Sequence, residues 1–180
     1  MSTDNRAAGL GLANMWVGFV AFAAAAVMGL YQVAERSGFF PFAESEAMYF
    51  ASVSTHGVLM GFVLTTFLIA GFCYYTATTS LDRPLWNRPL AWFGFGLCVI
   101  GVLVAAVPLL TGQASVLYTF YPPLRANPAF YIGAALLVVG SWFWCLEMVM
   151  MMVGWKRDNP GQIVPLAMFG TTANAIMWFI

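Results

Sequence analysis

Long apolar runs, each close to the length that a helix needs to cross a bilayer, follow one another along this sequence. About 20 mostly apolar residues span the hydrocarbon core as a helix. Only 8% of the 180 residues are charged and 62% are hydrophobic, whereas a soluble domain carries about a quarter charged residues. We therefore expect an all-α integral membrane protein embedded in a lipid bilayer.

Glycine, proline and polar residues separate the apolar runs, and Gly38 and Pro41 mark the first connection. The last run reaches the final residue after only about 24 Å of helix, which is shorter than the roughly 30 Å hydrocarbon core. We expect four complete transmembrane helices and a truncated fifth, all part of a larger helical bundle. The expected spans cover about residues 14–33, 47–75, 90–110, 128–153 and 164–180.

Basic residues are unevenly distributed between the two ends of the expected spans. The N-terminal tail and the second and fourth connections contain Arg6, Arg83, Arg88, Lys156 and Arg157, whereas the first and third contain only Arg36 and Arg125. Cytoplasmic loops are enriched in Lys and Arg, so we expect a multi-pass protein with a cytoplasmic N-terminus. The net charge is zero and no basic run occurs, so no nucleic-acid partner is expected.

His56, the only histidine, lies about nine residues into the second expected span, about 14 Å below the outer surface. An ionisable side chain at this depth is a functional candidate. Neutral imidazole is a good ligand for haem iron, because Nε2 offers a lone pair without bringing a charge into lipid. The alternative is a neutral histidine that is hydrogen-bonded to a neighbouring helix, and the residue type alone leaves both interpretations open.

The neighbours of His56 suit a flat cofactor. Gly57 and Gly61 are expected to leave room for a macrocycle beside the ligand. Either Ser52, four residues earlier, or a backbone carbonyl is expected to accept the Nδ1 proton and hold the ring. A six-coordinate haem needs a second axial ligand, and we expect it from outside this chain because there is no second histidine and none of the 11 methionines stands out.

Glu147 is the other ionisable residue within an expected span, about 14 Å from the inner surface. It is either a proton relay or a hydrogen-bonded structural carboxyl, and we favour the structural role. The methionines from Met148 to Met152 are interpreted as core packing or lipid-facing residues. The three cysteines are interpreted as small buried hydrophobic residues, because they share no CxxC spacing.

The third connection contains the sequence VLYTFYPPLR, in which Pro122 and Pro123 favour an extended backbone and bias Tyr121 away from helix. It is either an interfacial loop anchored by its aromatic side chains or a rigid lid over a cofactor near the outer face.

Two motifs resemble a known family. The segment STHGVLMGFV around His56 resembles the haem-ligand helix of haem-copper terminal oxidase subunit I, and LYTFYPPL resembles the loop that follows that family's third span. The resemblance covers essentially all of the sequence. The segments VPLLTGQASVLYTFYPPLRANPAFYIGA and WKRDNPGQIVPL are similar to the B-type branch of cytochrome c oxidases. The Gly-Gly-Phe-Gly-Asn stretch of the A-type branch is missing, so its proton entrance is not carried over to Asp82 and Asn87.

The resemblance implies that His56 is an axial ligand of low-spin haem b, and that the high-spin haem and copper B belong to a missing C-terminal part. It implies a proton-translocating oxidoreductase that reduces oxygen to water in a bacterial or archaeal plasma membrane. The implied partners are the rest of subunit I, a copper-bearing subunit II, and cytochrome c or a similar electron donor. This segment by itself is not expected to be active. Tyr118, Tyr121 and Arg125 are carried over only as members of the loop motif.

Two alternatives stay open at this point. One is a nitric oxide reductase-like subunit, since this enzyme belongs to the same superfamily and its deciding residues would lie beyond the sequence. The other is a non-catalytic membrane subunit that binds haem through a partner chain.

Overall fold

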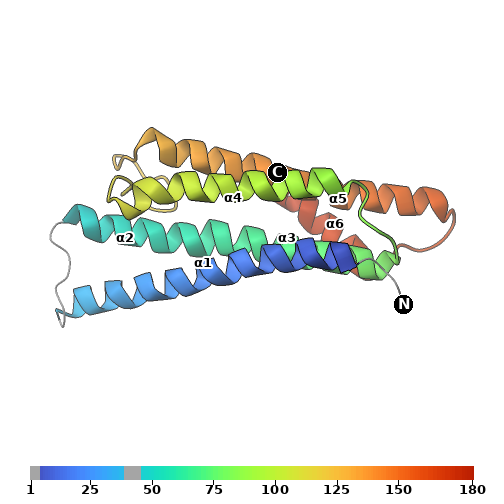
Figure 1. Ribbon diagram of the computed structural model, residues 1–180, viewed down its shortest axis with the longest axis horizontal. Coiled ribbons are helices and arrows are strands. Elements are labelled where there is room, and N and C mark those ends of the chain that lie inside the picture. Colours follow the sequence, from blue (N-terminus) through green and yellow to red (C-terminus); the bar gives the residue numbers. More distant parts are fainter. Residues whose placement is uncertain (1–4, 39–45) are drawn as a thin grey trace. The chain divides into compact units, whose positions relative to one another are not determined.

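The computed structural model describes residues 5–38 and 46–180, and within them the regular structure is helical (Figure 1). The elements are α1 (Asn5–Ser37), α2 (Glu46–Val58), the π-helix η1 (Leu59–Leu64), α3 (Thr65–Leu81), α4 (Arg88–Leu110), α5 (Pro128–Asp158) and α6 (Leu166–Phe179). Pro41, expected to break the chain between the first two spans, lies outside the described residues.

Four helical segments are long and apolar enough to cross a membrane: Gly9–Ser37, Glu46–Leu81, Arg88–Leu110 and Pro128–Asp158. A shorter apolar helix, Leu166–Phe179, follows them. This confirms the expected all-α membrane fold with four spans and a shorter fifth helix. The helices extend past the expected spans at several ends, for instance to Asp158, because composition marks only the apolar part of a helix that continues into polar residues.

The second span changes its helical type in the middle. It starts as α2, passes through the six residues of η1 and continues as α3. A π-helix bonds residue i to residue i+5, and such segments are frequent at functional sites. The Thr65 hydroxyl donates to the Gly61 carbonyl at 2.6 Å, and the Thr65 N–H donates to Phe62 O. Thr65 therefore donates hydrogen bonds to two carbonyl groups at the point where the π-segment returns to α-helix.

Asparagine and proline set the starts of α4 and α5. The Asn87 side-chain oxygen accepts the Leu90 N–H at 3.1 Å, and the Asn127 side-chain oxygen accepts the Ala129 N–H at 3.0 Å. Side-chain oxygens of this kind satisfy N–H groups that have no partner within the helix. Pro128 begins α5, a position that proline favours because its N–H is not needed there.

The chain forms two compact units. The first contains the chain up to Trp16 with residues 67–98 and 138–180, and the second contains residues 17–66 and 99–137. In the first unit, Met148 and Met151 are buried in the hydrophobic core, as are the cysteines 73, 98 and 145. This agrees with core packing for these two methionines and with a hydrophobic role for the cysteines.

Helices approach closely at glycines within each unit. In the first unit, a Cβ added to Gly71 would lie 2.7 Å from the Gly11 carbonyl oxygen. In the second unit, a Cβ added to Gly101 would lie 2.6 Å from the Gly133 carbonyl oxygen. Small residues at such contacts allow backbone-to-backbone packing, which is typical of transmembrane helices.

Candidate functional site

His56 lies near the end of α2 in the second unit, and its side chain is half-buried. Its Nδ1 is 2.8 Å from the backbone carbonyl oxygen of Ala25 in α1. A carbonyl can only accept, so Nδ1 carries the proton, and in the neutral ring the lone pair is then on Nε2. Among the residues that the structure describes, none makes a hydrogen bond to Nε2. The arrangement leaves one nitrogen with the electron pair that a metal ligand requires.

The second partner expected for Nδ1, Ser52, has another role. Its hydroxyl donates to the Tyr49 carbonyl at 2.7 Å within α2. The backbone carbonyl alternative is therefore the one that the structure contains. A serine in a helix commonly bonds to a carbonyl of the preceding turn, which removes it from the histidine.

Helix α1 faces His56 along one side. The Gln32 side chain donates to the Ser52 carbonyl at 3.0 Å, and Gly29 lies one turn from Ala25 on the same face of α1. A Cβ added to Gly29 would lie 3.2 Å from His56 Cε1 and 3.4 Å from His56 Nδ1. The sequence did not indicate this contact, because Gly29 lies in a different helix from His56 and far from it in the chain. The available signal was a glycine within the first expected span.

The glycines next to His56 lie against an aromatic ring of the loop between α4 and α5. A Cβ added to Gly57 would lie 2.8 Å from Tyr118 Cδ1, and one added to Gly61 would lie 3.6 Å from Tyr118 Cδ2. These glycines accommodate the Tyr118 ring, and the room for a macrocycle beside His56 stays a prediction. Sequence proximity to His56 does not tell which neighbour a helical glycine faces.

The loop between α4 and α5 is fastened to α2 beside His56. The Leu117 N–H donates to the Ser54 hydroxyl oxygen at 2.8 Å, and this hydroxyl donates in turn to the Phe50 carbonyl at 2.9 Å. Leu117 and Phe120 have φ values of 62° and 55°, a left-handed conformation that is uncommon for residues other than glycine. The loop that carries the YTFYPPL motif thus holds a specific conformation against the histidine-bearing helix.

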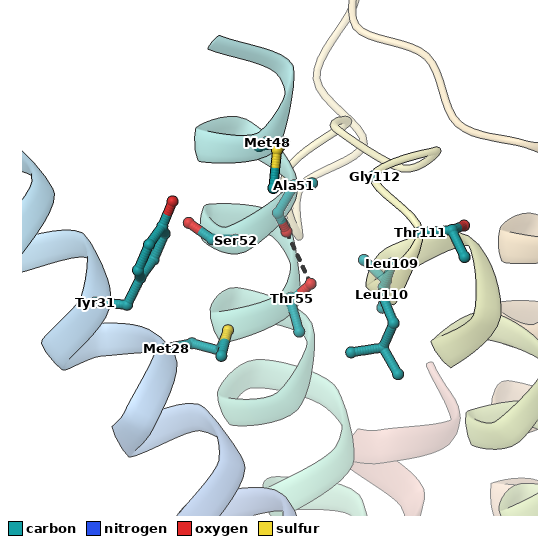
Figure 2. A pocket seen from close by; sticks show the side chains of 10 residues that line it. All are labelled: Met28, Tyr31, Met48, Ala51, Ser52, Thr55, Leu109, Leu110, Thr111 and Gly112. Carbon is teal, nitrogen blue, oxygen red and sulfur yellow. Dashed lines mark hydrogen bonds between the residues drawn. The ribbon is translucent and has the colours of Figure 1, made fainter. Parts of the chain in front are cut away.

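A cavity of about 420 Å³ lies in the second unit next to α2. Figure 2 shows Met28 and Tyr31 of α1 opposite Ser52 and Thr55 of α2, with the Thr55 hydroxyl bonded to the Ala51 carbonyl. The residues that line the cavity are Met28, Tyr31, Met48, Ala51, Ser52, Thr55, Leu109, Leu110, Thr111 and Gly112. An apolar wall with a few hydroxyl groups is typical of pockets for small apolar ligands. His56 is not among the lining residues.

Glu147 lies in the first unit and is 0% exposed. The Asn87 N–H donates to its two carboxyl oxygens at 2.9 and 3.2 Å. Glu147 in α5 therefore holds the residue that caps the start of α4. This contact supports the structural role favoured from the sequence, and the proton-relay role stays a prediction. Asn87 takes part in the same contact through its backbone.

The described residues suit one axial position of a haem. His56 offers Nε2 with its Nδ1 held by a carbonyl, the usual outer-shell arrangement of a metal-binding histidine. In the described parts of the chain, no group of three or more His, Cys, Asp or Glu residues is placed to hold a metal ion.

Comparisons with known proteins identify the family of this chain. The family model described as Cytochrome C and Quinol oxidase polypeptide I matches residues 9–180. Cytochrome c oxidase subunit 1 of Thermus thermophilus is 37% identical over 141 residues, which are 78% of this chain and 24% of that protein. A cryo-EM structure of a heme-copper terminal oxidase dimer is similar with a TM-score of 0.88 and 39% identity, covering 97% of this chain and 30% of that chain.

The chain thus spans about a quarter of the length of its curated relative and under a third of the solved structure's chain. The family match extends over nearly the whole sequence and includes both the His56 helix and the YTFYPPL loop. The chain therefore belongs to the haem-copper oxidase subunit I family of membrane oxidoreductases, as the resemblance predicted, and the cofactors of that family are haem and copper.

Proposed function

We propose that this chain is the N-terminal segment of subunit I of a respiratory terminal oxidase and that His56 is an axial ligand of its low-spin haem b. The observation that carries the proposal is the 2.8 Å contact between His56 Nδ1 and the Ala25 carbonyl. It selects the tautomer with the lone pair on Nε2. The family membership supports haem as the cofactor that this lone pair binds.

The chain's own residues hold and tune this ligand. A hydrogen bond from Nδ1–H to a carbonyl makes the imidazole a stronger donor and fixes its orientation. When bound, the haem supplies one-electron transfer. A second protein ligand of the haem would come from another part of the subunit, because this sequence has a single histidine.

The complete subunit is proposed to take electrons from cytochrome c or a similar donor through a copper-bearing subunit II. It reduces oxygen to water at a high-spin haem and copper B centre and translocates protons across a bacterial or archaeal plasma membrane. These steps use the part of subunit I beyond the present sequence. Assignment to the B-type branch rests on the loop sequences and stays a prediction, as does the cytoplasmic N-terminus.

Both relatives named above are described as oxidases, and this supports oxygen reduction over the nitric oxide reductase alternative. Oxygen and nitric oxide uptake by the purified complex, measured with selective electrodes, separates the two. Uptake of neither gas would favour the non-catalytic haem-binding subunit.

The His56→Ala variant of the complete oxidase tests the ligand assignment. We expect the reduced-minus-oxidised spectrum to lose the low-spin haem b band and the pyridine haemochrome assay to show a matching loss of haem b. Thr79→Ala is a control, because its hydroxyl bonds only to carbonyls of its own helix at the far end of the same span. A full low-spin haem signal in His56→Ala would disprove the ligand role.

A further inference from the structure

We infer that Gly29 of α1 is a positioning residue, which sets the orientation of the His56 imidazole by leaving no side chain against it. The inference rests on the proposed ligation of haem by His56. Gly29 lies in α1, whereas His56 lies in α2, so the contact at Gly29 tunes the iron site through the imidazole and not through a bond to the metal.

Two contacts from α1 define where the imidazole lies. The Ala25 carbonyl accepts the Nδ1 proton at 2.8 Å. One turn further along α1, the Cα of Gly29 faces the edge of the ring formed by Cε1 and Nδ1. The hydrogen bond holds Nδ1, and the second contact limits how far the Cε1 edge of the ring can shift toward α1.

The room at Gly29 serves the ring and not a helix crossing. Among the described residues, and apart from the backbone of α1 itself, His56 Cε1 and Nδ1 are the atoms that an added Cβ would meet within 4 Å, at 3.2 and 3.4 Å. At Gly71, by contrast, the nearest atom is a backbone carbonyl oxygen of the facing helix, at 2.7 Å. Within the part of the chain that the structure describes, a methyl group at position 29 would therefore press on the imidazole first.

The consequence is electronic as well as steric. An added methyl group displaces the ring by a few tenths of an ångström and weakens the Nδ1–H to Ala25 bond. A weaker bond makes the imidazole a poorer donor to ferric iron, so the ferrous form gains and the midpoint potential rises. Loss of an outer-shell partner changes the affinity or activity of a metal site by about 10- to 100-fold. For Gly29→Ala we expect up to about a tenfold change in the equilibrium constant between ferric and ferrous haem, which is about 59 mV for a one-electron couple.

The experiment compares Gly29→Ala and Gly29→Val with Gly9→Ala in the complete oxidase. Gly9 lies in the same helix, and an added Cβ there meets nothing within 4 Å. The readouts are the midpoint potential of the low-spin haem and the g-values of its ferric EPR signal, which report the orientation of the axial ligand. We expect a raised potential and shifted g-values in Gly29→Ala, a larger change in Gly29→Val, and none in Gly9→Ala.

Potentials and g-values of Gly29→Ala that match those of Gly9→Ala would overturn the inference. Failure of Gly29→Ala to fold while Gly9→Ala folds would also overturn it, because it would show that position 29 serves helix packing. His56→Ala separates this result from the proposed function. If His56→Ala keeps the low-spin haem, the ligand assignment fails, and if it loses that haem while Gly29→Ala is unchanged, only the inference fails.

Discussion

His56 in the second unit and Glu147 in the first are both ionisable residues within membrane-spanning helices, yet the structure treats them differently. The carboxyl oxygens of Glu147 both face the Asn87 N–H. His56 is held at Nδ1 alone, and Nε2 has no partner among the described residues. Depth in the membrane marks both residues equally. The two residues therefore differ in what they contact: Glu147 accepts a backbone N–H, whereas His56 donates to a backbone carbonyl and keeps the lone pair of Nε2.

Glu147 offers the largest expected effect and the sharpest test of this comparison. Glu147→Leu leaves the partly buried Asn87 N–H without its acceptor, which costs up to about 3 kcal/mol, whereas Glu147→Gln keeps a carbonyl oxygen for it. We expect a clear fall in the thermal unfolding temperature for Leu and a small one for Gln, with low-spin haem content unchanged in both. Unchanged stability in Glu147→Gln together with abolished turnover would instead favour the proton relay. Glu147 would then be a functional residue like His56 and not a structural one.

Gly57 tests the surroundings of the ligand. Gly57→Ala puts a methyl group 2.8 Å from the Tyr118 ring, and overpacking of this kind costs about 1–3 kcal/mol. We expect the loop between α4 and α5 to be cleaved faster in limited proteolysis. Gly96→Ala serves as the control, since an added Cβ there meets nothing within 4 Å. Equal cleavage rates in the two variants would show that Tyr118 is not seated on α2 by this contact.

Ser54 is expected to have a smaller effect on the same loop. Ser54→Ala removes the acceptor of the Leu117 N–H, a bond of 2.8 Å, and a typical hydrogen bond contributes about 1 kcal/mol. Hydrogen–deuterium exchange of the loop amides should become faster by about fivefold, which corresponds to this free energy. Ser80→Ala is a matched control, because its hydroxyl bonds to a carbonyl of its own helix. No change in loop exchange would remove Ser54 from the loop's attachment.

The smallest effect is expected in the first unit, at the ion pair of Arg83 and Asp158. The two groups are 2.9 Å apart, with side chains 33% and 57% exposed. Exposed pairs contribute about 0–1 kcal/mol and are screened by salt. Arg83→Ala should lower the unfolding temperature slightly at low salt and not at all at high salt. An effect as large as that of Glu147→Leu would mean that exposed contacts stabilise this unit as strongly as buried ones.

Several features could be predicted from the sequence because they are local. Apolar runs of sufficient length predict transmembrane helices, since every backbone polar group must be paired within lipid. The single deep histidine and the YTFYPPL motif predicted the family, and the comparisons confirm it. The π-helix η1 could not be predicted, because its residue types, Leu, Met, Gly, Phe and Val, also occur in the α-helical segments on either side.

The sequence by itself determined the membrane fold and the family, because length, hydropathy and motif order are properties of neighbouring residues. Only the tertiary structure decided which groups surround His56. Ala25 is 31 positions away from it in the sequence, and Gly57 faces the Tyr118 ring. A helix presents several faces, and its sequence does not state which face meets which neighbour. The packing of α1 against α2 places the Ala25 carbonyl at Nδ1, and this leaves the lone pair of the neutral ring on Nε2.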